Sequence, residues 1–260
     1  MRPFVRGWAV LASMIMAYIY NTAFYDYLRE GSVKSARKVA ALLSRDLSVT
    51  SVLDLGCGEG AWLSVWREMG VEEIVGVDGD YVDRSRCMFP AERFVCHDLS
   101  RPLRLDRRFD LVECLEVAEH IPHASAGDLV DSLTAHGDII LFSAAPPGQG
   151  GEFHINEQPY DYWRDLFRKR GYVALDAVRP GIRGCADVAS WYRYNIFVFV
   201  KEERLADLPR NLRDSVVQGT LTDISPPLYR IQKMVIHLLS PTMQGHLAQL
   251  RNHLWMLARG

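Results

Sequence analysis

The sequence lacks the features of several classes of protein. Its five cysteines include no C-x-x-C pair, so we predict no disulfide framework and a reducing, cytoplasmic location. The formal net charge is only −2, which gives no electrostatic reason to expect a nucleic-acid partner. The apolar run WAVLASMIMAYIY at 8–20 is too short to span a bilayer. We predict a buried or lid helix there rather than membrane contact.

The sequence does contain an alternation of apolar runs with helical patterns. Strands are predicted at 51–55, 73–77, 92–95, 109–115, 138–143, 172–178 and 195–200, and helices at 60–69, 81–88, 125–135 and 158–170. This alternation predicts an α/β fold whose doubly wound, seven-stranded sheet is mostly parallel and has one antiparallel edge strand. We divide the chain into N-terminal lid helices (1–48), a ligand-binding α/β domain (49–201) and a helical C-terminal extension (202–260).

A glycine-punctuated loop follows the first predicted strand, in VLDLGCGEGAW at 52–62. Gly56, Gly58 and Gly60 allow positive φ angles and a close approach of the backbone to a ligand. The spacing GxGxG differs from the GxGxxG of nicotinamide-binding loops, and Gly-Ala-Trp stands where a phosphate-binding P-loop has Gly-Lys-Ser/Thr. Both of those ligand classes are therefore disfavoured.

Three acidic side chains lie at the ends of successive predicted strands. Asp54 comes just before the glycine loop, where a carboxylate can bind an ammonium group. Asp78 ends the second strand, where an acid binds ribose hydroxyls, and Asp98 follows the third, where it can accept a hydrogen bond from an adenine amino group. An ammonium, a ribose and an adenine in chain order favour S-adenosylmethionine (SAM) over a dinucleotide.

Residues 51–143 resemble the class I SAM-dependent methyltransferases, with the motifs VLDLGCGEG, VGVDGDYVDRS, FVCHDLS and FDLVECLEVAEHIP. The wider stretch 18–200 is similar to a bacterial methyltransferase-domain group whose substrates are largely unassigned. The resemblance implies a Rossmann-like methyltransferase fold, SAM as the cofactor and a final antiparallel strand. The predicted cofactor-binding residues are Asp54, Gly56, Cys57, Gly58, Gly60, Asp78, Gly79, Asp98, Leu99 and Glu116.

Polar residues after the fourth and fifth strands are candidates for the acceptor site, because ligands bind at the carboxyl ends of parallel strands. We predict His120 and His154 as catalytic bases, with Glu119 orienting His120. Tyr25 is a further catalytic candidate through cation–π contact with the sulfonium. The predicted substrate residues are Tyr20, Asn21, Gln149, Asn156, Tyr192 and Asn195. No metal is expected, because no recognised ligand pattern accompanies His120.

The leading hypothesis is methyl transfer to oxygen or nitrogen of a small molecule, which could be a metabolite, a sugar or a natural-product intermediate. One alternative is cyclisation of SAM itself to azetidine-2-carboxylate, with release of methylthioadenosine. The others are a non-catalytic cofactor-binding protein and a membrane-associated methyltransferase acting on lipids or glycans. The leucine stripe of the C-terminal helices predicts packing on the body of the protein or a homodimer.

Overall fold

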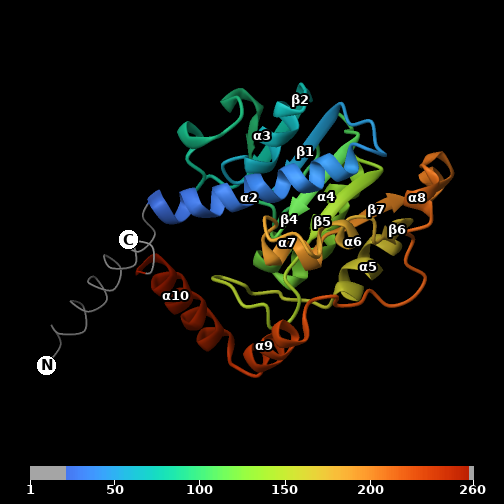
Figure 1. Ribbon diagram of the computed structural model, residues 1–260. Helices are drawn as coiled ribbons and strands as arrows, with labels where there is room; N and C mark the ends of the chain where they lie inside the picture. The colour runs from blue at the N-terminus through green and yellow to red at the C-terminus, as the bar shows by residue number, and fades with distance from the viewer. Residues whose placement is uncertain (1–21, 258–260) are drawn as a thin grey trace, which may run out of the picture.

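Seven strands form one sheet in the middle of the protein, and helices lie on both of its faces (Figure 1). The computed structural model describes the backbone of residues 22–257 and the side chains of residues 29–250 except that of Pro241. The strands are β1 (Ser51–Leu55), β2 (Glu73–Asp78), β3 (Phe94–Cys96), β4 (Leu111–Leu115), β5 (Ile139–Ser143), β6 (Tyr172–Leu175) and β7 (Phe197–Lys201). The α-helices are α2 (Thr22–Leu43), α3 (Ala61–Glu68), α4 (Ala126–His136), α5 (Tyr160–Arg168), α6 (Arg179–Ile182), α7 (Ser190–Asn195), α8 (Arg210–Arg213), α9 (Pro227–His237) and α10 (Pro241–Leu257).

The strand order β3-β2-β1-β4-β5-β7-β6 confirms the predicted doubly wound sheet. Strands β3, β2, β1, β4 and β5 are parallel to their neighbours, whereas β7 is antiparallel to both β5 and β6. The antiparallel strand is therefore not at the edge, as predicted, but between two other strands. Parallel strands place their carboxyl ends along one edge of the sheet, and this edge carries the glycine loop and the candidate site.

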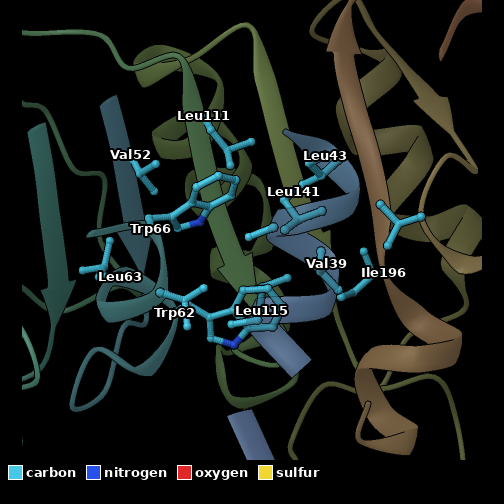
Figure 2. Close-up of a cluster of buried hydrophobic side chains, with 14 of the residues drawn as sticks. Val39, Leu43, Val52, Trp62, Leu63, Trp66, Leu111, Leu115, Leu141 and Ile196 are labelled. Atoms are coloured by element: carbon cyan, nitrogen blue, oxygen red, sulfur yellow. The ribbon is translucent and has the colours of Figure 1, made fainter. Parts of the chain in front are cut away.

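Apolar side chains alternate between the two faces of the central strands. Val52 of β1 packs with α2 and α3, whereas the next residue, Leu53, packs on the opposite face with α4 and α5. Figure 2 shows Val39 and Leu43 of α2 beside Leu141 of β5 in the first of these cores. Burial on both faces explains why the strands read as continuous apolar runs in the sequence.

Two local predictions are wrong. The helix predicted over 81–88 is limited to a single 3₁₀ turn, Arg84–Arg86, because the Asp83 carboxylate accepts a hydrogen bond from the Ser85 N–H at 2.9 Å and caps that turn. The sequence also predicts a helix that begins after an N-cap at Ser32, ahead of apolar residues at helical spacing. Ser32 instead lies inside α2, which begins at Thr22.

The C-terminal extension packs on the loop that follows β5. A Cβ atom at Gly148 would lie 1.9 Å from the carbonyl oxygen of Lys233 in α9, so only glycine allows this contact. The Lys233 ammonium is buried and pairs with Asp223 at 2.5 Å. The leucines of the predicted stripe do not make this contact: Leu238 is 84% exposed, and Leu247 and Leu250 are exposed as well. The homodimer stays a prediction. Exposed apolar side chains on α9, its C-cap and α10 are Leu228, Ile231, Met234, Val235, Leu238, Met243, Leu247 and Leu250.

Within the described residues, no helix combines the length and apolar character needed to cross a membrane.

Candidate active site

The glycine loop between β1 and α3 needs glycine for two different reasons. Gly56 and Gly60 have φ angles of 86° and 82°, and a Cβ atom there would lie 2.2 Å from Val117 and 2.1 Å from Phe89, respectively. Gly58 has a φ angle of 52°, but a Cβ atom there would meet nothing within 4 Å. The first two glycines are therefore required for packing within the protein. Gly58 instead borders open space that a ligand can enter.

Asp78, at the end of β2, fixes the position of this loop. Its Oδ2 accepts a hydrogen bond from the Gly58 N–H at 2.7 Å, and its Oδ1 accepts one from the Gly79 N–H at 2.7 Å. The hydroxyl of Tyr81, an exposed side chain, also donates to Oδ1. Asp78 thus holds the loop while one of its oxygens also accepts a hydrogen bond from an exposed side chain.

Asp54 is a buried carboxyl group beside the same loop. Only 3% of the residue is exposed. Burial, and then the charge of Asp78, raise the pKa of Asp54 to about 8, and no other group lowers it. Its cross-strand neighbour in β4 is Glu113, whose pKa burial also raises and whose Oε1 accepts a hydrogen bond from Trp66 Nε1 at 2.7 Å. A cation reaching Asp54 would therefore favour the ionised carboxylate, which burial otherwise disfavours.

Two cavities meet at the glycine loop. The main cleft, about 1000 Å³ in volume, is lined by Asp78, Gly79, Asp98, Leu99, Glu116 and His120 among others. The inner cavity, about 210 Å³, is lined by Asp54, Cys57, Gly58, Trp62 and Tyr192 among others. Gly56 lines both. Every predicted cofactor-binding residue except Gly60 therefore lines one of two adjoining cavities.

Asp98 lies on the rim of the main cleft in an exposed turn. Its Oδ1 accepts hydrogen bonds from the N–H and the hydroxyl of Ser100 at 3.0 and 2.6 Å, and these bonds lower the pKa of Asp98. The side chain is therefore ionised and caps a turn. It also borders the space where we predict the adenine.

A hydrogen-bonded chain connects the end of β4 to the loop after β5. Glu116, with a φ angle of 56°, accepts a hydrogen bond from Gln149 Nε2 at 2.7 Å. Asn195 Nδ2 donates to Gln149 Oε1 at 2.7 Å, and the Tyr160 hydroxyl donates to Asn195 Oδ1 at 2.8 Å. Gln149 and Asn195, which we predicted to contact the substrate, thus hold the Glu116 carboxylate at the cleft wall.

His120 and His154 lie against each other, with ring centroids 4.9 Å apart and ring planes at 86°. His120 Nδ1 is 3.2 Å from the Phe153 carbonyl oxygen, and His154 Nδ1 is 2.8 Å from Glu157 Oε1. His120 opens to the cleft, but desolvation by the protein around its ring and the neighbouring His154 lower its pKa to about 4, so that it is neutral at pH 7. The prediction that Glu119 orients His120 is wrong, because a backbone carbonyl makes that contact.

The remaining predicted residues fall in different places. Asn156 is buried, and its Nδ2 lies 3.3 Å from the Ala118 carbonyl oxygen, so it anchors the loop rather than facing the cleft. Tyr192 lines the inner cavity. Tyr20 and Asn21 lie outside the described residues. Tyr25 lies in α2, but its side chain is outside the part of the chain whose side chains the structure describes.

Some residues of the site are not among those predicted from the sequence. Arg29 and Ser32 of α2 line the inner cavity. Glu157 orients His154, and Tyr81 contacts the predicted ribose-binding carboxylate. A signal existed only for Glu157, because it stands three residues after a histidine in a loop rich in glycine.

Comparison with known proteins points to the same fold. Residues 27–143 match the family model described as a methyltransferase domain. The chain is similar to magnesium protoporphyrin IX methyltransferase (ChlM) from Synechocystis PCC 6803 with bound SAM, at 20% identity over 70% of this chain and 88% of that chain, with a TM-score of 0.50. It is also similar to the sugar N-methyltransferase KedS8 from Streptoalloteichus sp ATCC 53650, at 18% identity over 68% and 92% of the two chains, with a TM-score of 0.52.

A third similar structure is DesVI from Streptomyces venezuelae, at 16% identity over 71% of this chain and 98% of that chain, with a TM-score of 0.53. No curated protein sequence matches the chain.

Proposed function

Because the chain carries a domain of the class I SAM-dependent methyltransferase family, whose cofactor is SAM, we propose that it transfers the methyl group of SAM to an oxygen or nitrogen atom of a small polar molecule. The observation that carries this proposal is the pair of cavities that meet at Gly56, each with a carboxylate in its wall. SAM has an adenosine part and a methionine part on either side of its sulfonium. Each part carries a group that a carboxylate can bind, the ribose hydroxyls in the first and the ammonium group in the second.

The adenosine half is assigned to the main cleft and the methionine half to the inner cavity. In the main cleft, Asp78 would accept hydrogen bonds from the ribose hydroxyls once the Tyr81 hydroxyl leaves Oδ1. In the inner cavity, the ammonium group would pair with Asp54. Gly58, with open space where a Cβ atom would be, lets the backbone approach the cofactor closely.

The acceptor is assigned to the part of the main cleft near His120 and Glu116. A sulfonium is already an activated methyl donor, so the protein mainly has to align the acceptor atom with the S–CH₃ bond. Such alignment lowers a barrier by roughly 7–11 kcal/mol. A hydroxyl or ammonium acceptor must also lose a proton. His120, which lines the cleft and packs against His154, offers hydrogen-bonding atoms to such an acceptor.

The test is to incubate the purified protein with SAM and separate pools of hydroxyl and amino compounds, and to identify the nucleoside by mass spectrometry. Accumulation of S-adenosylhomocysteine (SAH) that depends on one pool supports the proposal. Methylthioadenosine formed without any acceptor would support cyclisation instead, and SAH binding without turnover on any pool would support a non-catalytic role. Asp78→Asn is the control, because it should lose cofactor binding and all turnover together.

A further inference from the structure

We propose that Glu119, His120 and His154 form a binding site for a divalent transition-metal ion in the wall of the main cleft. Each of the three side chains offers a ligand atom, and these atoms lie within 4.8 Å of one another. Two atoms bound at about 2.1 Å to the same ion in a tetrahedral site are about 3.4 Å apart, so ion binding requires the ligand atoms to move closer together by up to about 1.4 Å.

The buried carboxylate of Glu119 is the first argument for an ion. The residue is 0% exposed, and neither of its side-chain oxygens has a hydrogen-bond partner among the described residues. A buried carboxylate without partners is costly, and buried charges in proteins are normally paired or bound to metal. The two nearest side chains with matching chemistry are the imidazoles of His120 and His154, which can share a cation with the carboxylate.

Both histidines are also oriented by a hydrogen bond from Nδ1, as metal-ligating histidines usually are. His120 donates from Nδ1 to the Phe153 carbonyl oxygen, and His154 donates from Nδ1 to Glu157, at 3.2 and 2.8 Å. These contacts fix the tautomer that carries a lone pair on Nε2, the atom left to bind a metal. The carboxylate of Glu157 is itself held by backbone N–H groups of the loop, including that of Gly150 at 2.8 Å.

Gly151 packs directly against the imidazole of His154. A Cβ atom at this position would lie 2.1 Å from His154 Nε2, and glycine at 151 has no positive φ angle to explain its presence. The requirement is therefore the close packing of the ring on the loop backbone, so a side chain at 151 would displace the imidazole that carries the third ligand atom.

Two imidazole nitrogens and one carboxylate oxygen suit Mn²⁺, Fe²⁺, Co²⁺ or Zn²⁺. Three protein ligands leave coordination positions open on the ion. Because His120 lines the main cleft, these open positions would face the space that we assign to the acceptor. A metal ion lowers the pKa of an oxygen bound to it. The inference rests on the proposed function and narrows it to an acceptor with a hydroxyl group that binds the ion.

In the resulting step, the metal-bound hydroxyl releases its proton to water. An electron pair of the oxygen then forms the new C–O bond to the methyl carbon. The C–S bond breaks at the same time, and its electron pair returns to the sulfur, which gives neutral SAH. The prediction from sequence that no metal is bound depended on finding a ligand pattern along the chain, and here the third ligand comes from a separate loop.

The experiment measures binding of Co²⁺ and Mn²⁺ to the full chain after dialysis against a chelator, by calorimetry and by the visible spectrum of the Co²⁺ form. We expect one ion per chain. Glu119→Gln and Gly151→Ala should each weaken binding at least tenfold, and His123→Ala, which removes an exposed histidine outside the cluster, should not change it.

SAH affinity is measured on every variant, because it reports folding and the cofactor site independently of the metal. Metal binding that is absent, or that is unchanged in Glu119→Gln while SAH still binds, would overturn the metal site and leave the proposed function standing. If the wild-type protein does not bind SAH, the proposed function is wrong. If it binds metal but not SAH, the metal site stands without a role in methyl transfer.

Discussion

The buried carboxyl of Asp54 makes the affinity of the protein for its cofactor depend on pH near neutrality. With a pKa of about 8, Asp54 is mostly protonated at pH 7 in the protein without cofactor. Pairing with the cofactor's ammonium requires the carboxylate, so binding must remove this proton. The α-amino group of the ligand stays protonated below about pH 7, so the loss of affinity in that range comes from the carboxyl group.

The expected magnitude follows from the fraction of ionised Asp54. Each pH unit below the pKa lowers that fraction, and hence the affinity, about tenfold. Between pH 7 and pH 6, the Kd for SAH should therefore rise by about tenfold, or about 1.4 kcal/mol. Calorimetry in buffers of different ionisation enthalpy should detect release of nearly one proton per SAH bound at pH 6.5.

The Asp54→Asn variant is the matched control. Because asparagine does not titrate, its weaker binding should show no proton release and little change between pH 6 and pH 7. A wild-type Kd that stays constant over this range without proton release would refute the argument that the ammonium pairs with a carboxyl of raised pKa.

Three further substitutions have defined outcomes. Tyr81→Phe removes the hydroxyl that occupies Asp78, and calorimetry should find SAH bound about 2- to 10-fold more tightly, from one hydrogen bond of about 0.5–1.5 kcal/mol; weaker binding would mean that Tyr81 contacts the cofactor. Trp66→Phe removes the hydrogen-bond donor of buried Glu113, so the free energy of unfolding in urea should fall by about 1–3 kcal/mol, and an unchanged value would contradict the role of this bond. Gly60→Ala introduces a Cβ atom 2.1 Å from a phenylalanine ring at a φ angle of 82° and should cost about 1–3 kcal/mol in the same assay, whereas full stability would show that the loop can rearrange.

The sequence predicts the sheet well because burial on both faces makes each central strand an uninterrupted apolar run. The strand containing Leu53 is predicted with its observed bounds, 51–55. The positions of Asp54 and Asp78 follow from the same pattern, since parallel strands end along one edge and bring their terminal residues together. Periodicity failed over 81–88, where a side-chain cap rather than an apolar face sets the conformation.

The acceptor side of the site could not be predicted in the same way. Glu119 and His154 meet because the loop after β5 folds back, with the N–H groups of Ile155 and Asn156 both donating to the Glu119 carbonyl oxygen at 2.9 Å. Such contacts depend on the three-dimensional path of an irregular segment and leave no periodic signal. Composition indicated that this loop is polar and functional, but not which of its side chains converge.

The most direct test of the account is a crystal structure of the protein with SAH. We expect the ribose hydroxyls within hydrogen-bonding distance of Asp78, the ammonium group beside Asp54, and the sulfur facing the part of the cleft that holds His120. An adenosine group bound away from Asp78, or an amino-acid portion that does not enter the cavity beside the glycine loop, would contradict it.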